Sequence, residues 1–120
     1  MRDAFFGWLD GALSGGPAQG AAAWCFNLYE ESDGGFSAQL VGAARFDEND
    51  PDWPCDEVFT SGEDLLEFAA DGWEEAQEAI ARLVKDYLED GRHASLLCGA
   101  EAVAVGFVDG DLDVIYKKAR

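Results

Sequence analysis

The segment from residue 72 to residue 89 constrains the fold most, because it predicts one long amphipathic helix that needs an apolar surface to pack against. Its apolar residues recur at steps of three and four, the spacing of one helix face. They are Trp73, Ala76, Ile80, Leu83, Val84, Tyr87 and Leu88. Acidic residues precede Arg82 and Lys85, an order that complements the helix dipole, and Gly91 is suited to end the helix.

The closing part of the chain predicts a β-hairpin with strands at 101–108 and 111–117. The two residues between them, Asp109 and Gly110, form the pair that a type I′ turn favours. This turn places the apolar side chains of both strands on one face. The expected cross-strand pairs are Phe107–Leu112, Val105–Val114 and Val103–Tyr116.

A second hairpin is predicted from strands at 22–31 and 36–46. A three-residue loop, Asp33-Gly34-Gly35, keeps the apolar side chains of both strands on one face, and a glycine supplies the positive φ. A two-residue loop would set Leu28 against Gln39 and split the apolar residues between the faces, so the longer loop is favoured. The expected pairs are Leu28–Leu40, Phe26–Gly42 and Trp24–Ala44.

The remaining segments predict shorter elements. Apolar spacing indicates a helix over Asp3–Leu13, followed by a glycine-rich linker at 14–20. Val58–Thr60 is expected to be an edge strand, and a short helix capped by Thr60 or Ser61 is expected to run to Phe68. A further helical turn is expected within 92–98.

We therefore expect an α+β fold in one domain, 1–120. It is built on a mostly antiparallel sheet from two hairpins, at about 22–46 and 101–117. The long helix, at about 72–89, and the short N-terminal helix pack on that sheet. Residues 1–20 form the N-terminal helix and linker, and residues 21–120 form the sheet-helix body.

The net charge of the chain limits the classes of molecule that we expect it to bind. Its 120 residues contain 25 acidic and 8 basic residues, a net charge of -17. Because nucleic acids and anionic membranes are themselves polyanions, we expect neither as a direct partner. Three cysteines without a CxxC pair, no signal peptide and no apolar run long enough to span a membrane indicate a cytoplasmic protein.

Few residues suit catalysis or metal binding. His93 is the only histidine, and no recognised signature surrounds it or its neighbours Ser95 and Cys98. The acidic run 47–52 superficially resembles a calcium loop, but it lacks the glycine and glutamate that such a loop requires. Phosphate-binding and common hydrolase motifs are absent. We therefore expect no enzyme, no catalytic residue, no metal site and no cofactor.

The strongest functional pattern is an acidic loop. Between Arg45 and Arg82 the chain has no Lys or Arg but thirteen acidic residues. An aromatic side chain within a charged rim is typical of an electrostatically steered protein interface. The residues expected to bind a basic protein partner are Asp47, Glu48, Asp50, Asp52, Trp53, Asp56 and Glu57. The alternative is that Trp53 folds back into the core and the acids form a solvated face.

Three segments together resemble small acidic immunity proteins of bacterial polymorphic and contact-dependent toxin systems. They are FDENDPDWPCDEVF (46–59), WEEAQEAIARLVKDYLEDG (73–91) and AVAVGFVDGDLDVIY (102–116). The resemblance implies a non-enzymatic inhibitor that blocks the active site of a toxin, often a basic nuclease. Toxin inhibition and DNA mimicry both require an acidic surface, so both stay open.

Two other interpretations also stay open. One is a small-molecule-binding domain or small enzyme, with a pocket between sheet and helix near Tyr87, His93 or Cys98. The other is an assembly module that dimerises through the apolar side chains of the N-terminal helix. These side chains are Phe5, Phe6, Trp8 and Leu9.

Overall fold

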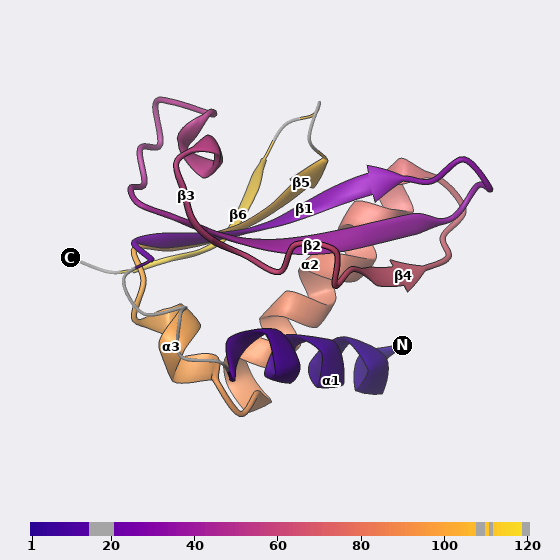
Figure 1. Cartoon of the computed structure of the whole chain (residues 1–120), viewed down its shortest axis with the longest axis horizontal. Coiled ribbons are helices and arrows are strands. Elements are labelled where there is room, and N and C mark those ends of the chain that lie inside the picture. The colour runs from indigo at the N-terminus through magenta and orange to yellow at the C-terminus, as the bar shows by residue number, and fades with distance from the viewer. Residues whose placement is uncertain (15–20, 108–109, 111, 119–120) are drawn as a thin grey trace.

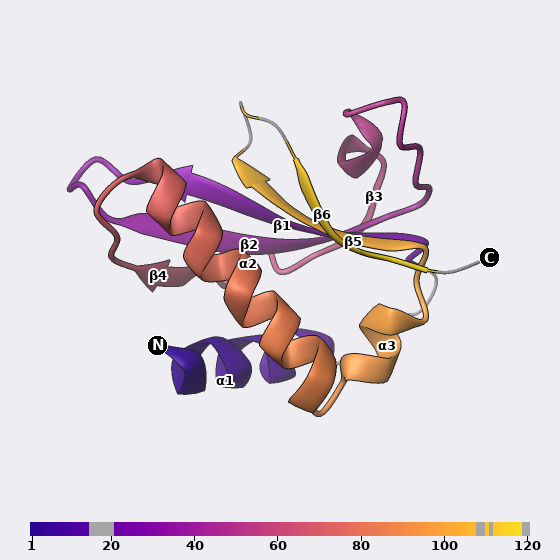
Figure 2. The same cartoon turned by 180° about the vertical axis from the view of Figure 1, so that it is seen from behind.

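One six-stranded mixed sheet carries three helices on the same face (Figures 1 and 2). The structure is a computed structural model, and it describes residues 1–14, 21–107, 110 and 112–118. The helices are α1 (Arg2–Leu13), α2 (Trp73–Asp90) and α3 (Ala94–Cys98), with a 3-10 turn, η1 (Trp53–Cys55). The strands are β1 (Ala23–Glu30), β2 (Phe36–Ala43), β3 (Glu57–Thr60), β4 (Leu66–Phe68), β5 (Ala102–Phe107) and β6 (Asp113–Lys117).

The sheet joins the two expected hairpins side by side. Its strand order is β3-β2-β1-β5-β6, and β4 also pairs with β2, beyond the end of β3. Only the central β1–β5 pair is parallel; the other pairs are antiparallel. The prediction of an α+β fold with a mostly antiparallel sheet, a long helix and a short N-terminal helix is confirmed.

The β1–β2 hairpin has the expected buried face but a different register. Its three-residue loop is 32–34, one residue earlier than expected, and closes with the Glu31 N–H donating to the Gly35 carbonyl at 2.8 Å. Gly34 takes the positive φ, and the Asp33 carboxylate accepts the Gly35 N–H. Leu28 therefore lies opposite Ala38 rather than Leu40. A two-residue slip leaves every side chain on its own face, so the apolar face survives the change.

The β5–β6 hairpin also departs from its expected register. Val103 pairs with Tyr116 as predicted, but an irregularity follows, and Val105 lies opposite Asp113 instead of Val114. The Phe107–Leu112 pair does not occur among the recorded pairs, and most of the expected turn (108–109 and 111) lies outside the described residues. Because of this irregularity, Val114 turns outward and is 42% exposed.

The segment after β3 is a strand rather than the expected short helix. β4 pairs with the first half of β2, and its two apolar side chains point inward while Glu67 points to solvent. Phe68 stacks on Phe36 with ring centroids 5.9 Å apart. This tertiary packing outweighs the helical preference of the acidic residues that precede it. The expected edge strand is present as β3.

Helix α1 is part of the main core. Phe5, Leu9 and Leu13 are buried, and Phe5 contacts the rings of Phe26 and Tyr87. The indole N–H of Trp8 donates to the Asp64 carbonyl at 2.8 Å, which ties α1 to the β3–β4 connection. Of the four apolar side chains expected to form a dimer, Phe5 and Leu9 are therefore buried in the chain's own core, and Phe6 and Trp8 are half-buried.

Helix α2 packs beside α1 across the sheet and ends at Gly91, as predicted. Gly91 has an ordinary φ of -73°, so its role is steric: a Cβ there would lie 2.5 Å from the ring of Tyr87. The hydroxyl of Tyr87 donates to Asp10 at 2.7 Å and accepts the backbone N–H of His93 at 3.1 Å. Burial and Asp10 both raise the pKa of Tyr87. The expected helical turn in 92–98 is α3.

The opposite face of the sheet is only partly covered. No α-helix lies on it in the described structure; instead the segment 44–56, which includes the 3-10 turn η1, lies above it (Figure 1). Under this segment a small second core forms. Its buried members are Ala23, Cys25, Ala43, Trp53, Ala102 and Ala104, with Phe46 and Leu112 packed against them.

Candidate functional site

The acidic loop expected to bind a partner is held together by a cation from its own chain. Arg45 donates to Asp50 at 2.6 Å and to Asp56, and its guanidinium lies 3.9 Å from Asp47. Lys117, at the end of β6, pairs with Glu48. Four of the expected partner-binding carboxylates are thus engaged inside the molecule.

The electrostatic effect of these pairs is visible in Asp50. The Arg45 guanidinium and the backbone N–H of Asp52 lower the pKa of Asp50 below its ordinary value. Reciprocally, Asp50 and Asp56 raise the pKa of Arg45. A cation therefore already sits among these carboxylates, and the loop presents less negative charge than its composition suggests.

Trp53 does not serve as the exposed aromatic anchor. Its side chain is only 2% exposed and lies in the second core, in edge-to-face contact with Phe46 at 5.3 Å. No described α-helix covers the apolar sheet surface beneath it, so burying the indole there is favourable. The alternative reading, in which Trp53 folds back into the core, holds for this residue.

The two remaining loop acids, Asp52 and Glu57, line a cavity of about 450 Å³ above the sheet. Tyr29 and Cys55 also line it, and the β5–β6 hairpin closes its other side. The structure thus brings Asp47, Asp50 and Asp56 together around Arg45, and leaves Asp52 and Glu57 apart at this cavity.

Two polar side chains at and beneath this cavity have partners within the fold. Tyr29 donates to Gln39 at 2.9 Å, and the thiol of buried Cys25 donates to Asn27 at 3.2 Å. Burial raises the pKa of Tyr29, with a contribution from Glu57. Burial likewise raises the pKa of Cys25, to about 12. Both groups stay protonated at neutral pH, which leaves neither as an ionised nucleophile.

Tyr87, His93 and Cys98, around which a pocket is expected, do not line the cavity beside α2, the cavity above the sheet or the cavity at Phe46. Tyr87 is fully buried and its hydroxyl is satisfied within the fold. In the described part of the chain, no three His, Cys, Asp or Glu side chains are grouped to hold a metal ion. No helix there is long and apolar enough to span a membrane.

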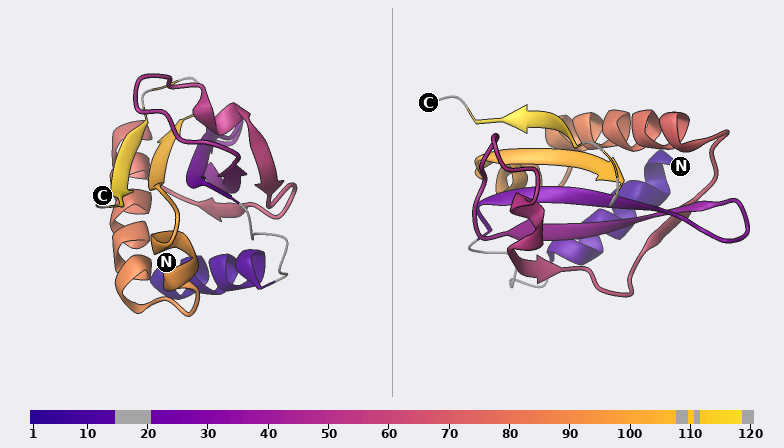
Figure 3. Two further views of the ribbon diagram at one scale, coloured as in Figure 1. Left: turned by 90° about the vertical axis from the view of Figure 1, so that its left-hand side faces the viewer. Right: turned by 90° about the horizontal axis from the view of Figure 1, so that it is seen from above.

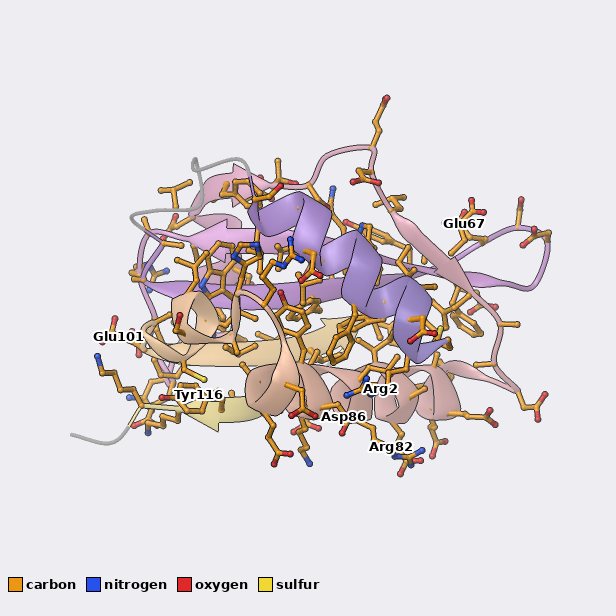
Figure 4. The ribbon with its side chains drawn as sticks, turned by 90° about the horizontal axis from the view of Figure 1, so that it is seen from below. Arg2, Glu67, Arg82, Asp86, Glu101 and Tyr116 are labelled. Atoms are coloured by element: carbon orange, nitrogen blue, oxygen red, sulfur yellow. The ribbon has the colours of Figure 1, made fainter. Side chains whose placement is uncertain are left out.

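A different set of carboxylates lies at the end of the molecule where the β1–β2 turn, β4 and the start of α2 meet (Figures 1 and 2). We call this the acidic end. It comprises Glu30, Glu31, Asp33, Glu67, Asp71, Glu74 and Glu75. All except Glu31 are exposed, and within the described residues none forms an ion pair with Lys or Arg. Figure 4 shows Glu67 at this end.

An exposed tryptophan stands beside the acidic end. A row of aromatic rings leads from the buried Phe68 through Phe36 and Phe107, with centroids 5.9 Å apart at each step. It finishes at Trp73, whose ring meets Phe107 edge-on at 6.4 Å. Trp73 is 58% exposed although the rest of the row is largely buried. It lies between Asp71 and Glu74 in the chain.

The periodicity of 72–89 predicts Trp73 on the same apolar face as Ala76 and Ile80. The structure instead leaves it at the first residue of the helix, beyond the edge of the core. The signal that could have indicated this is its position, because an apolar residue in the first helical turn often extends past the surface that the later turns cover. The three neighbouring acids, Asp71, Glu74 and Glu75, also indicate a position exposed to solvent.

Comparison with known proteins identifies no relative. No family model matches the chain, and neither a curated protein nor a solved structure is similar to it at a significant level.

Proposed function

We propose that this chain is a non-enzymatic binding protein that contacts a basic protein partner through its acidic end and Trp73. One observation carries the proposal: an exposed indole lies among carboxylates that have no cationic partner within the described residues. In this proposal Trp73 replaces Trp53 as the aromatic anchor, and the interface lies at the acidic end rather than in the loop 47–57.

The physical basis is the difference between free and engaged charge. Carboxylates that lack a cation attract a basic surface over about a Debye length, ~8–10 Å at physiological salt, and raise the association rate. An exposed tryptophan adds a large apolar contact, and Lys or Arg of the partner can lie over its ring. The two effects together favour a partner whose cations surround an apolar depression.

Inhibition of a toxin is the specific form of this function that the sequence resemblance suggests. A nuclease active site is built to hold phosphates, so an acidic surface matches its charge. The same surface suits a protein that occupies a DNA-binding site. In either case the partner loses access to its nucleic acid while the acidic protein is bound.

The experiment compares two charge-neutralised variants with the unchanged protein. One carries Glu67→Gln, Asp71→Asn and Glu75→Gln at the acidic end. The other carries Asp47→Asn, Asp52→Asn and Glu57→Gln in the loop, and so removes the same number of charges. Each tagged protein is incubated with lysate of its source cells at low and high salt, and retained proteins are quantified by mass spectrometry.

We expect a basic protein that the unchanged chain and the loop variant retain, that the acidic-end variant loses, and that high salt releases. Trp73→Ala should lose the same protein. Equal retention by both variants would contradict the proposal, because it would assign binding to total charge. Loss from the loop variant alone would return the interface to residues 47–57.

A further inference from the structure

A groove of about 530 Å³ runs between the solvent-facing side of α2 and β6. It begins at Trp73, follows α2 as far as Lys85, and includes Asp113 at the start of β6. Figure 3 shows β6 beside α2 at the outer edge of the sheet. The groove therefore extends from the exposed indole of the proposed interface along the whole first part of the long helix.

The groove meets the sheet at Asp113, the first residue of the edge strand β6. β6 is the outermost strand on this side of the sheet, and within the described residues it pairs with β5 alone; β3 and β4, both paired with β2, form the other side. Outward backbone N–H and C=O groups of such a strand are ready to pair with another extended chain. A helix wall beside a free strand edge is a geometry in which peptides bind by strand addition.

The charges along the groove change sign. Glu74, Glu78 and Asp113 lie toward the Trp73 end, and Arg82 and Lys85 lie farther along α2. Within the described residues, neither Arg82 nor Lys85 has an ion-pair partner, although the chain has 25 acids for 8 bases. Figure 4 shows Arg82 on the outer side of α2. Because Arg82 and Lys85 are unpaired in the described structure, they are able to bind a carboxylate of another molecule.

We propose that the α2–β6 groove binds an extended segment of the basic protein partner, which adds to β6 as a further strand. A cationic side chain of the segment lies against Trp73, Glu74 and Glu78, and an acidic one lies against Arg82 and Lys85. This inference rests on the proposed function, because Trp73 belongs to both surfaces. It names the part of the partner that the protein recognises.

The spacing of the two charges in that segment follows from helix geometry. The midpoint of Glu74 and Glu78 lies between seven and eight residues before the midpoint of Arg82 and Lys85, which is about 11 Å along the helix axis. A strand advances about 3.3 Å per residue. Because alternate side chains share a face, the cation and the acid should be about four residues apart.

A second copy of this chain is a poor occupant of the groove. Each copy carries a net charge of -17, so pairing two β6 edges would bring like charges together. A partner segment that brings a cation to the Trp73 end reduces this charge instead.

The test uses a fluorescent nine-residue peptide, Ser-Thr-Arg-Thr-Val-Thr-Glu-Thr-Ser, and its reversed sequence, since the added strand can run in either direction. Two further versions of the tighter binder are N-methylated, one at the even and one at the odd positions among its inner residues. Binding is followed by fluorescence anisotropy, and the contact is located from amide shifts in two-dimensional NMR of the full chain. Sedimentation velocity reports the oligomeric state.

We expect one N-methylation pattern to abolish binding and the other to leave it nearly unchanged, because only one edge of the added strand pairs with β6. Amide shifts should concentrate in β6 and the first half of α2. Arg82→Glu with Lys85→Glu should weaken binding by up to about fivefold for each ion pair lost, and a peptide with Lys in place of Glu should restore it. Arg92→Glu, an exposed charge change outside the groove, is the matched control.

Four outcomes would each overturn the inference. Two concern the peptides: neither of them binds, or the two N-methylation patterns have equal effects. The other two concern the protein: the amide shifts are confined to residues outside β6 and α2, or the chain forms a dimer that the peptide dissociates. If the acidic-end variant loses its basic partner but the peptides do not bind as expected, then strand addition in the groove is wrong and the proposed function stands. If the peptides bind as expected and no basic protein is retained, the proposed function fails by itself.

Discussion

The acidic loop and the acidic end each combine carboxylates with a nearby tryptophan, but their structures are opposite. The segments 47–57 and 67–75 each contain one tryptophan and no Lys or Arg. In the loop Trp53 is 2% exposed, and Arg45 and Lys117 engage the neighbouring acids. At the acidic end Trp73 is 58% exposed, and the acids have no such partner in the described part of the chain.

The difference arises from what lies beneath and beside each run. The loop crosses a sheet face on which the described structure has no α-helix, and its indole covers Cys25 and the alanines around it. The acidic end adjoins the other face, where α1 and α2 already complete the core, and Trp73 has nothing left to cover. A charged run with an aromatic residue thus indicates an interface only where the core is complete without that residue.

The largest expected effect is on stability. Trp53→Ala should lower the free energy of unfolding by about 3–5 kcal/mol, because it empties most of the second core. Trp73→Ala should cost less than about 1 kcal/mol, since a half-exposed ring loses only its edge contact with Phe107. Urea denaturation at pH 7 measures both. Equal costs would mean that Trp73 is structural and that the two regions do not differ as described.

Much of the fold was predictable, and the failures have local causes. The bounds of α2, the edge strand β3 and the buried face of the first hairpin follow from periodicity, which depends on neighbours in sequence. The slip of the first hairpin depends on whether Ser32 or Asp33 opens the loop, a choice that periodicity does not determine because both registers bury the same face. β4 required knowledge that Phe68 stacks on Phe36.

The candidate site was less predictable than the fold. The acidic excess is visible in the sequence, but the pairing that removes part of it is not. Arg45 lies just before the loop and Lys117 lies near the other end of the chain, and only the sheet brings Lys117 to Glu48. Which carboxylates stay free is therefore a property of the tertiary structure.

The reactivity of the cysteines gives a second test of the difference between the buried Trp53 and the exposed Trp73. In a Cys98→Ser background, exposed Cys55 should react rapidly with a thiol reagent at pH 8, and Cys25 at least about a hundredfold more slowly. Cys25 is buried beneath the loop and its pKa is raised to about 12, so little thiolate forms. Trp53→Ala should accelerate the reaction of Cys25, whereas Trp73→Ala should not. Fast labelling of Cys25 in the unchanged protein would show that the loop does not stay closed.

The smallest expected effect tests Arg45 itself. Because Arg45 lowers the pKa of Asp50, the carboxylate stabilises the folded state at pH values above the ordinary aspartate pKa, about 4, and this contribution is lost as acid protonates Asp50. Arg45→Ala should therefore lower the Tm at pH 7 by a small amount, and the difference from the unchanged protein should disappear at low pH. High salt should reduce it, since these groups are exposed.

The matched variant at the acidic end should behave differently. Glu67 has no cation to lose, so Glu67→Gln should leave the Tm at pH 7 unchanged or raise it slightly by relieving repulsion. Thermal melts between pH 3 and pH 8 measure how the Tm of each variant depends on pH. A Tm loss for Glu67→Gln that acid abolishes would place an unrecognised cation at the acidic end. The charge there would then be engaged like that of the loop, and the surface would lose the property on which its proposed role depends.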